Sequence, residues 1–170
     1  MTSRTIPTAT RDELEVATSG AALIAFLTVT HPNLDQPIRV VSDPMDFVWA
    51  GVTYSGVVFS WRPLGDGEAA PVSEITLQNV DRRIGQALIE TRQRAEVALS
   101  ILSTADFDLS ANPRTELGTP AEVYAFSRFE IVDVEANAVE IRARVMLRDY
   151  SQEPWPGIAA TQSRLPGAFR

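Results

Sequence analysis

The strictest pattern in this sequence is an alternation of apolar and polar side chains near its C-terminal end. Apolar residues occupy every odd position from Val139 to Leu147, and positions 140, 142 and 144 are all charged. Successive side chains of a β-strand point to opposite faces of a sheet, so a period of two is the period of a strand. The pattern therefore predicts a strand with one face against an apolar core and the other in water.

Residues 122–134 are predicted to be the partner of this strand in a hairpin. If residues 135–137 form a three-residue loop with Asn137 in a left-handed conformation, Ile131 lies opposite Ile141. The core face of the partner strand is then expected to carry Val123, Ala125, Phe129 and Ile131.

Charged residues bear on this register in two ways. It places Glu130 opposite Arg142, which is an attractive cross-strand pair. It also places Arg128 opposite Arg144, which counts mildly against it. This pairing remains the preferred one.

Further segments have the composition of strands, and they are residues 21–30, 37–43, 47–49, 52–54, 57–61, 72–80 and 96–102. The Pro-Asn stretch after His31 predicts a hairpin loop between the first two segments. Ala50 and Gly51 predict a tight turn between the third and fourth, because glycine readily takes a positive φ. Gly56 is a candidate bulge before the fifth.

Two segments have helical patterns. Residues 10–18 predict a short helix in which Thr10 and Glu13 have the spacing of a capping box. A longer, principal helix is predicted from Asp81. Its apolar face would carry Ile84, Ala87, Leu88 and Thr91. The expected fold class is therefore mainly β with one principal helix, an α+β chain.

The sequence divides into three expected parts, which are an N-terminal segment with the short helix (1–20), a β-rich core domain (21–150) and an irregular C-terminal arm (151–170). Prolines and glycines in the arm prevent regular structure. Its Trp155, Leu165 and Phe169 are nevertheless costly to leave in water. Such an arm packs either on its own domain or on a neighbour.

Composition excludes several classes of function. With 22 acidic and 15 basic residues the net charge is −7, which argues against a general nucleic-acid backbone binder. The absence of cysteine removes disulfides, thiolate metal sites and thiol nucleophiles. The longest apolar run, residues 21–27, is far shorter than the roughly 20 residues that span a bilayer. The first residues lack the apolar core of a secretory signal, so we expect a soluble protein made in the cytoplasm.

Few residues offer chemistry. The single histidine, His31, precedes a proline and is more typical of a turn than of a catalyst. The stretch from Asp106 to Glu116 vaguely resembles a calcium loop, but it lacks the required glycine and its last acid falls one position early. Asp43 and Asp46 lie beside a proline and are interpreted as turn formers rather than as a carboxylate pair. We therefore expect no enzyme, no cofactor and no metal.

Aromatic and arginine side chains remain as candidates for binding. A ligand-stacking surface could be formed by aromatic residues that core positions explain better, namely Trp49, Tyr54, Phe59 and Trp61. Every basic residue is arginine, which suits planar and stacked contacts. Arg82 and Arg83, beside the predicted long helix, are expected either to be solvated or to pair with acids of a partner subunit.

Several segments taken together look familiar. The most specific are LQNVDRRI (77–84) and the Pro-Gly-punctuated ending with EPWPG (153–157) and LPGAF (165–169), to which FLTVTHPNL (26–34) and PIRVV (37–41) add. The chain resembles, over about residues 20–170, a domain-of-unknown-function family of minor tail proteins from long-tailed phages, prophages and related particles. Members of that family are typically encoded after the tape-measure gene, near hub and peptidase genes.

The resemblance implies a virion structural protein at the tail tip, synthesised in the cytoplasm of the bacterial host. It implies an antiparallel β-sandwich or barrel related to tail-tube and distal-tail proteins, assembled as a symmetric, sixfold ring. The implied partners are further copies of the chain and other tail-tip, hub and tube proteins, without direct nucleic-acid binding or membrane insertion. The expected assembly contacts are Arg82, Arg83, Trp155, Pro156, Leu165 and Phe169.

Two alternatives to a ring component stay open. The first is a module at the tail tip that binds host-surface glycans or an ion, built on the aromatic hairpin 47–61. The second is an assembly chaperone or an enzyme; a chaperone would be missing from purified particles.

Overall fold

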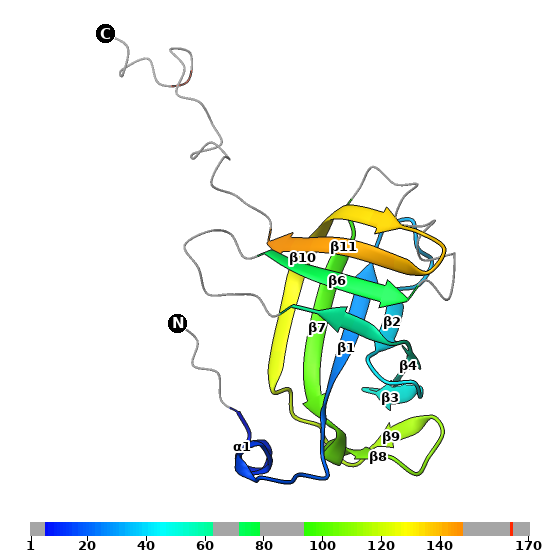
Figure 1. The fold of residues 1–170 in the computed structure, drawn as a ribbon. Helices are drawn as coiled ribbons and strands as arrows, with labels where there is room; N and C mark the ends of the chain where they lie inside the picture. Colours follow the sequence, from blue (N-terminus) through cyan, green and yellow to red (C-terminus); the bar gives the residue numbers. More distant parts are fainter. Residues whose placement is uncertain (1–5, 63–71, 79–93, 148–163, 165–170) are drawn as a thin grey trace.

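The computed structural model describes residues 6–62, 72–78, 94–147 and 164, which form a curved β-sheet with a short helix at one end (Figure 1). The strands are β1 (Leu23–Thr30), β2 (Ile38–Val41), β3 (Phe47–Trp49), β4 (Val52–Gly56), β5 (Phe59–Trp61), β6 (Val72–Gln78), β7 (Glu96–Ser103), β8 (Phe107–Asp108), β9 (Arg114–Glu116), β10 (Tyr124–Ala136) and β11 (Glu140–Leu147). The helices of the described residues are α1 (Thr8–Glu15) and the 3-10 turn η1 (Thr104–Asp106). The mainly β fold class is therefore confirmed. The longer helix predicted from Asp81 lies outside the described residues.

The strands form one sheet in the order β5-β6-β11-β10-β7-β1-β2-β4-β3-β9-β8. Most neighbours are antiparallel, but β2 pairs with β4 and β3 pairs with β9 in parallel. The expectation of a purely antiparallel sheet is thus corrected to a mixed one. The reason is that the chain reverses twice between β2 and β4, through the β3–β4 hairpin, so that β4 returns in the direction of β2.

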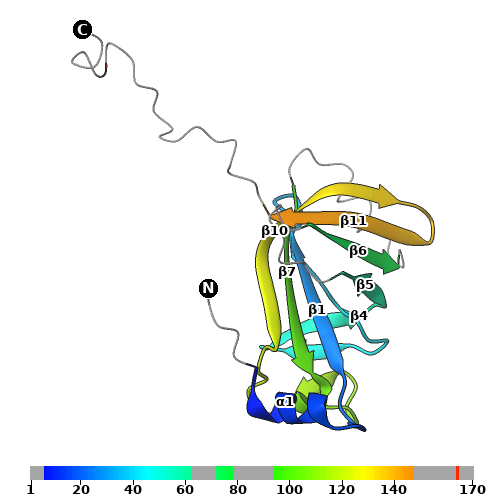
Figure 2. The same cartoon turned by 60° about the vertical axis from the view of Figure 1, so that its left-hand side comes forward.

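The sheet bends so that β6 and β11 cross the direction of β1 and β7 (Figure 2). Side chains from both parts meet in the main core, the apolar cluster formed by β1, β2, β5, β6, β7, β10 and β11. Its most deeply buried members include Leu27, Leu99, Ile141 and Val145. Two parts of a sheet that cross in this way form an orthogonal sandwich, which needs strands that turn the corner between them.

The corner strand is β10, which pairs with β7 along its first half and with β11 along its second. Its register shifts between Phe126 and Phe129 and again between Ile131 and Asp133, and Arg128 has a φ of 65°. Bulges of this kind bend a strand and change which side chains face inward. Phe126 and Phe129 are consequently both buried, with ring centroids 4.6 Å apart.

The predicted core face of the last hairpin is partly wrong. Phe129 and Ile131 are buried as predicted. Ala125, however, is exposed, and the buried side chain beside it is that of Phe126, which precedes the first bulge.

The predicted register of this hairpin is also wrong. Ile131 lies opposite Val145 rather than Ile141, whose partner is Ala136. The loop was predicted too early in the chain, at residues 135–137, because β10 continues to Ala136 and β11 begins only at Glu140. A later turn displaces the whole ladder.

The turn of this hairpin also differs from the prediction. Asn137 does not have the left-handed conformation, since Ala50 and Arg128 are the non-glycine residues with positive φ in the described chain. Its side-chain Oδ1 instead accepts hydrogen bonds from the backbone N–H groups of Val139 and Glu140, each 2.8 Å away. The Asn137 N–H also donates to the Glu140 carbonyl, so the side chain and the backbone of the asparagine close the turn together.

Most of the other predicted strands and turns are confirmed. β1 and β2 form the expected antiparallel hairpin, and β6 and β7 lie where period-two patterns placed them. In the turn between β3 and β4, Ala50 and Gly51 have φ values of 51° and 72°. Gly56 continues the pairing of β4 with β2 opposite Val41, without a register shift. A glycine is required at position 56 because a Cβ there would lie 2.7 Å from backbone atoms of Met45.

The helix α1 begins earlier than predicted and without the predicted capping box. Its N-cap is Pro7, whose carbonyl accepts from the N–H of Arg11, and there is no side-chain capping hydrogen bond. Thr10 is already inside the helix and its side chain is buried. Glu13 turns toward the sheet instead, where its Oε2 accepts from the hydroxyl of Ser103 at 3.1 Å.

A second apolar cluster, the aromatic core, lies on the opposite face of β1 from the main core. Phe26 is at its centre, and four aromatic rings lie within 5.0–5.7 Å of its centroid. They are Phe47, Trp49, Tyr54 and Phe107. Because β1 sends Phe26 to this cluster and Leu27 to the main core, the strand is buried on both faces.

Candidate functional site

The expected assembly contacts are outside the described residues. Arg82 and Arg83 fall in the range 79–93, and Trp155, Pro156, Leu165 and Phe169 fall in the ranges 148–163 and 165–170. The candidate site is therefore built from surfaces of residues that the structure describes.

His31 is a structural residue of the β1–β2 loop. It is only 3% exposed, its Nδ1 accepts from the N–H of Asn33 at 3.0 Å, and its carbonyl accepts from Leu34. These bonds shape the loop around Pro32 and confirm the interpretation as a turn residue.

The acidic stretch 106–116 contains the short hairpin β8–β9. Asp108 accepts two hydrogen bonds from Ser110, one from its hydroxyl and one from its N–H. The first of these is the main cause that lowers the pKa of Asp108. Glu116 accepts from the N–H of Ala50 on the neighbouring hairpin. Among the described residues no three acidic or histidine side chains gather as metal ligands would.

Asp43 and Asp46 both act in loop structure, as the turn-former interpretation predicts. Asp43 accepts from the N–H of Met45 through Oδ1 and from Arg114 Nη1 through Oδ2, both at 2.9 Å. Asp46 accepts from the N–H of Gly56 at 2.8 Å. Each carboxylate therefore holds a backbone amide of the loop in place.

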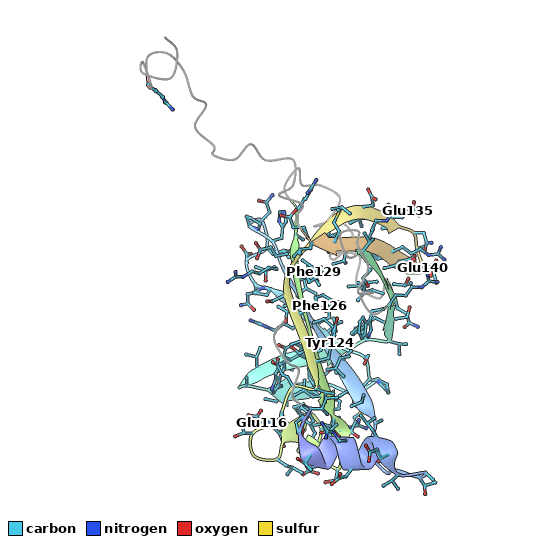
Figure 3. All side chains as sticks on the ribbon, turned by 90° about the vertical axis from the view of Figure 1, so that its left-hand side faces the viewer. Glu116, Tyr124, Phe126, Phe129, Glu135 and Glu140 are labelled. Atoms are coloured by element: carbon cyan, nitrogen blue, oxygen red, sulfur yellow. The ribbon has the colours of Figure 1, made fainter. Side chains whose placement is uncertain are left out.

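The aromatic residues of hairpin 47–61 are divided between the two cores. Trp49 and Tyr54 pack on Phe26 in the aromatic core. Trp61 packs against the main core and stacks on Tyr124 at 5.9 Å, which Figure 3 labels on β10. A single stacking platform for a ligand would need these rings on one surface, so the core interpretation fits their positions better.

A polar groove of about 620 Å³ lies along β6, β10 and β11. Arginines and acids line it in equal numbers, and they are Arg62, Glu74, Asp133, Glu135, Arg142 and Arg144. The Nη1 of Arg144 lies 3.5 Å from Asp133, and Arg142 pairs with Glu140 at 2.7 Å. Figure 3 labels Glu135 and Glu140 at this end of the molecule. Paired charges leave the groove without a strong preference for an anion or a cation.

A different surface, which we call the basal groove, lies between α1 and η1. In Figure 2, α1 lies at the other end of the molecule from β11. Its volume is about 510 Å³, and it is lined mostly by apolar atoms. Val16 and Leu109 form its apolar sides and are 57% and 46% exposed. Asp12 and Glu13 lie along its helical side.

Hydrogen bonds fix the two walls of the basal groove. The Ala22 N–H donates to the Thr104 hydroxyl, and the Thr104 N–H donates to the Ala22 carbonyl, both at 2.8 Å. Glu13 accepts from Ser103, so α1 is held against the end of β7. The groove is thus a formed surface and not a gap beside a loose helix.

Further exposed apolar side chains lie on segments at the same end of the molecule. Leu14 on α1, Leu23 opposite Ser103 and Leu117, whose N–H donates to the Asp106 carbonyl, are each between 44% and 60% exposed. With Val16 and Leu109 they make up what we call the basal apolar surface. Large apolar side chains exposed at one end of a domain are candidates for contact with another molecule.

Sequence reasoning found part of these surfaces. The alternation in β11 placed Arg142 and Arg144 on its outer face, where they line the polar groove. The basal groove was missed because its walls come from residues about 90 positions apart, as the contact between Glu13 and Ser103 shows. The available signal was the short helix itself, in which Leu14 and Val16 are apolar residues without a visible partner.

The fold and its surfaces define a small, mainly β domain with a crossed-sheet core and an apolar contact surface at one end. The chain belongs to the family described as domain of unknown function DUF1833, whose model matches residues 9–159. The match includes every described strand and most of α1. No curated protein matches the chain. No described helix is long and apolar enough to cross a membrane.

Proposed function

We propose that the protein is a non-enzymatic structural component of the tail tip of a long-tailed phage or phage-like particle. In this proposal it forms a ring with further copies of itself, most simply sixfold, and contacts the hub and tube proteins. It is made in the cytoplasm of the bacterial host and is carried in the virion. The family resemblance described above supports the location in a phage tail. The exposed surfaces of the fold support assembly through contacts between subunits.

The observation that carries the proposal is the basal apolar surface. Val16 and Leu109 are exposed along the basal groove, and Leu14, Leu23 and Leu117 are exposed on segments at the same end of the molecule. Assembly would remove this surface from water, and burial of apolar area contributes about 25 cal/mol per Å². In a ring, each copy offers one face to one neighbour and a different face to the other.

The arm over residues 151–170 is the proposed second half of the contact. Its sequence carries Trp155, Leu165 and Phe169 between prolines and glycines. Aromatic anchors of this kind contribute most of the free energy at many protein interfaces. Arg82 and Arg83 are proposed as further contacts.

Deletion of residues 151–170 tests the proposal directly. The truncated protein should fold and yet be absent from purified particles, as measured by mass spectrometry of the particle proteins. A double Trp155→Ala, Phe169→Ala variant should show the same loss, and Gln152→Ala, Gln162→Ala is its matched control. Normal incorporation of the truncated protein would contradict the proposal, and so would absence of the full-length chain from particles.

A further inference from the structure

We propose that the basal groove is the receptor for residues 164–170 of a neighbouring copy of this chain. The inference rests on the proposed function, because it names the two surfaces that join adjacent subunits of the assembly. Its occupant is the segment RLPGAFR, whose two large apolar side chains are Leu165 and Phe169.

The shape of the groove suits a short apolar segment. Its volume of about 510 Å³ is within the usual range of about 300–1,000 Å³ for binding pockets. Val16 and Leu109 are exposed along it and would be covered by the leucine and phenylalanine of the segment. The two hydrogen bonds between Ala22 and Thr104 keep the wall at Thr104 in place before anything binds.

Charge complementarity favours this segment as the occupant. α1 contains the acids Asp12, Glu13 and Glu15 against Arg11 alone, a net charge of −2. Residues 164–170 contain Arg164 and Arg170 and no acid, a net charge of +2. One oxygen of Glu13 already accepts from Ser103, so Asp12 is the carboxylate best placed to meet an incoming arginine.

The positions of the two surfaces favour a neighbouring copy over the same chain. β11 ends at the opposite end of the domain from α1 in both Figure 1 and Figure 2. A segment that follows β11 therefore starts far from the groove of its own domain. When donor and receptor lie at opposite ends, a head-to-tail contact repeats from copy to copy and can close by rotation.

The absence of cysteine from the chain permits a clean cross-linking test. Full-length Ala105→Cys, which places a thiol in the groove, is mixed with full-length Ala168→Cys, which places one in the arm. A short bismaleimide then joins thiols that are close together. The matched control replaces Ala105→Cys by Ala138→Cys, an exposed alanine in the β10–β11 turn.

We expect the Ala105→Cys mixture to give roughly tenfold more cross-linked dimer than the control, since docking raises the effective concentration of the thiols to about the mM range. Asp12→Arg in the groove partner should reduce this yield several-fold. Equal yields for Ala105→Cys and Ala138→Cys would overturn the inference. A chain carrying both Ala105→Cys and Ala168→Cys that closes only on itself would overturn it as well.

These outcomes are separable from failure of the proposed function. If the arm is needed for incorporation into particles but shows no preference for the groove, the tail-tip proposal stands and the receptor assignment fails. If the arm cross-links to the groove but the protein is absent from particles, the receptor assignment stands and the tail-tip proposal fails.

Discussion

Arg114 reaches from β9 to Asp43, and its Nη1 lies 2.9 Å from Asp43 Oδ2, although 71 positions separate the two residues. The same guanidinium lies 5.2 Å from the centroid of the Phe47 ring. Both charged side chains are about four-fifths buried, with 20% and 17% of their surfaces exposed. Arg114 therefore connects β9, the loop after β2 and the aromatic core.

Replacement of Arg114 by methionine should lower the free energy of unfolding by about 2 kcal/mol, because it removes a charged hydrogen bond and leaves the largely buried Asp43 without its cation. Urea denaturation measures the loss. Arg144→Met is the control, since the pair with Asp133 is 62% and 67% exposed and such a pair contributes less than about 1 kcal/mol. Equal losses in the two variants would show that the Arg114–Asp43 pair contributes no more to stability than an exposed ion pair does.

Phe26→Ala should be among the most damaging substitutions in the described chain. The ring is 1% exposed and contacts four other aromatic rings. Loss of a buried phenylalanine costs about 3–5 kcal/mol. Val139→Ala, at a side chain that is 75% exposed, should change stability by less than about 0.5 kcal/mol. A loss below about 1 kcal/mol for Phe26→Ala would contradict the aromatic core.

Gly56→Ala should destabilise the protein by about 1–3 kcal/mol, because the added methyl would overlap backbone atoms of Met45 and Pro44 that lie only 2.7 Å away. Gly20→Ala provides the contrast, since a Cβ there meets nothing within 4 Å. Thermal unfolding of the two variants should separate them clearly. Comparable midpoints would mean that the close approach at Gly56 is absent.

Ser110→Ala should raise the pKa of Asp108 toward the usual range of an aspartate, because the serine hydroxyl is the main cause that lowers it. A lowered pKa in the folded state stabilises the protein above the usual aspartate pKa, and that contribution is lost as the pH falls through the lowered value. NMR titration of the Asp108 carboxyl carbon measures the change. Ser127→Ala, at an exposed serine of β10, should leave the titration unmoved.

The sequence predicted most strands because burial on one or both faces leaves a direct trace in the residue pattern. β11 alternates strictly, and so does its burial from Glu140 to Val145. β1 has almost no alternation, and the structure buries it between two cores. Both patterns report the surroundings of a strand and are local in the chain.

Bulges and long-range contacts leave no such trace in a period-two pattern. In β10, Phe126 and Phe129 are three positions apart, a spacing that two core residues of one regular strand cannot have. The bulge between them interrupts the alternation, so the pattern does not indicate which residues of this stretch face the core. The basal groove depends on the hydrogen bond between Glu13 and Ser103, which are far apart in the sequence. No local pattern indicates against which strand end a short helix packs.

The position of β1 between the two cores has a consequence for how the domain opens. Neither the main core nor the aromatic core can unfold while β1 stays paired in the sheet, because β1 contributes Leu27 to the first and Phe26 to the second. The two clusters should therefore melt in one cooperative transition. The amide protons of Phe26 and Leu27 should then exchange with solvent at the same slow rate, that of global unfolding.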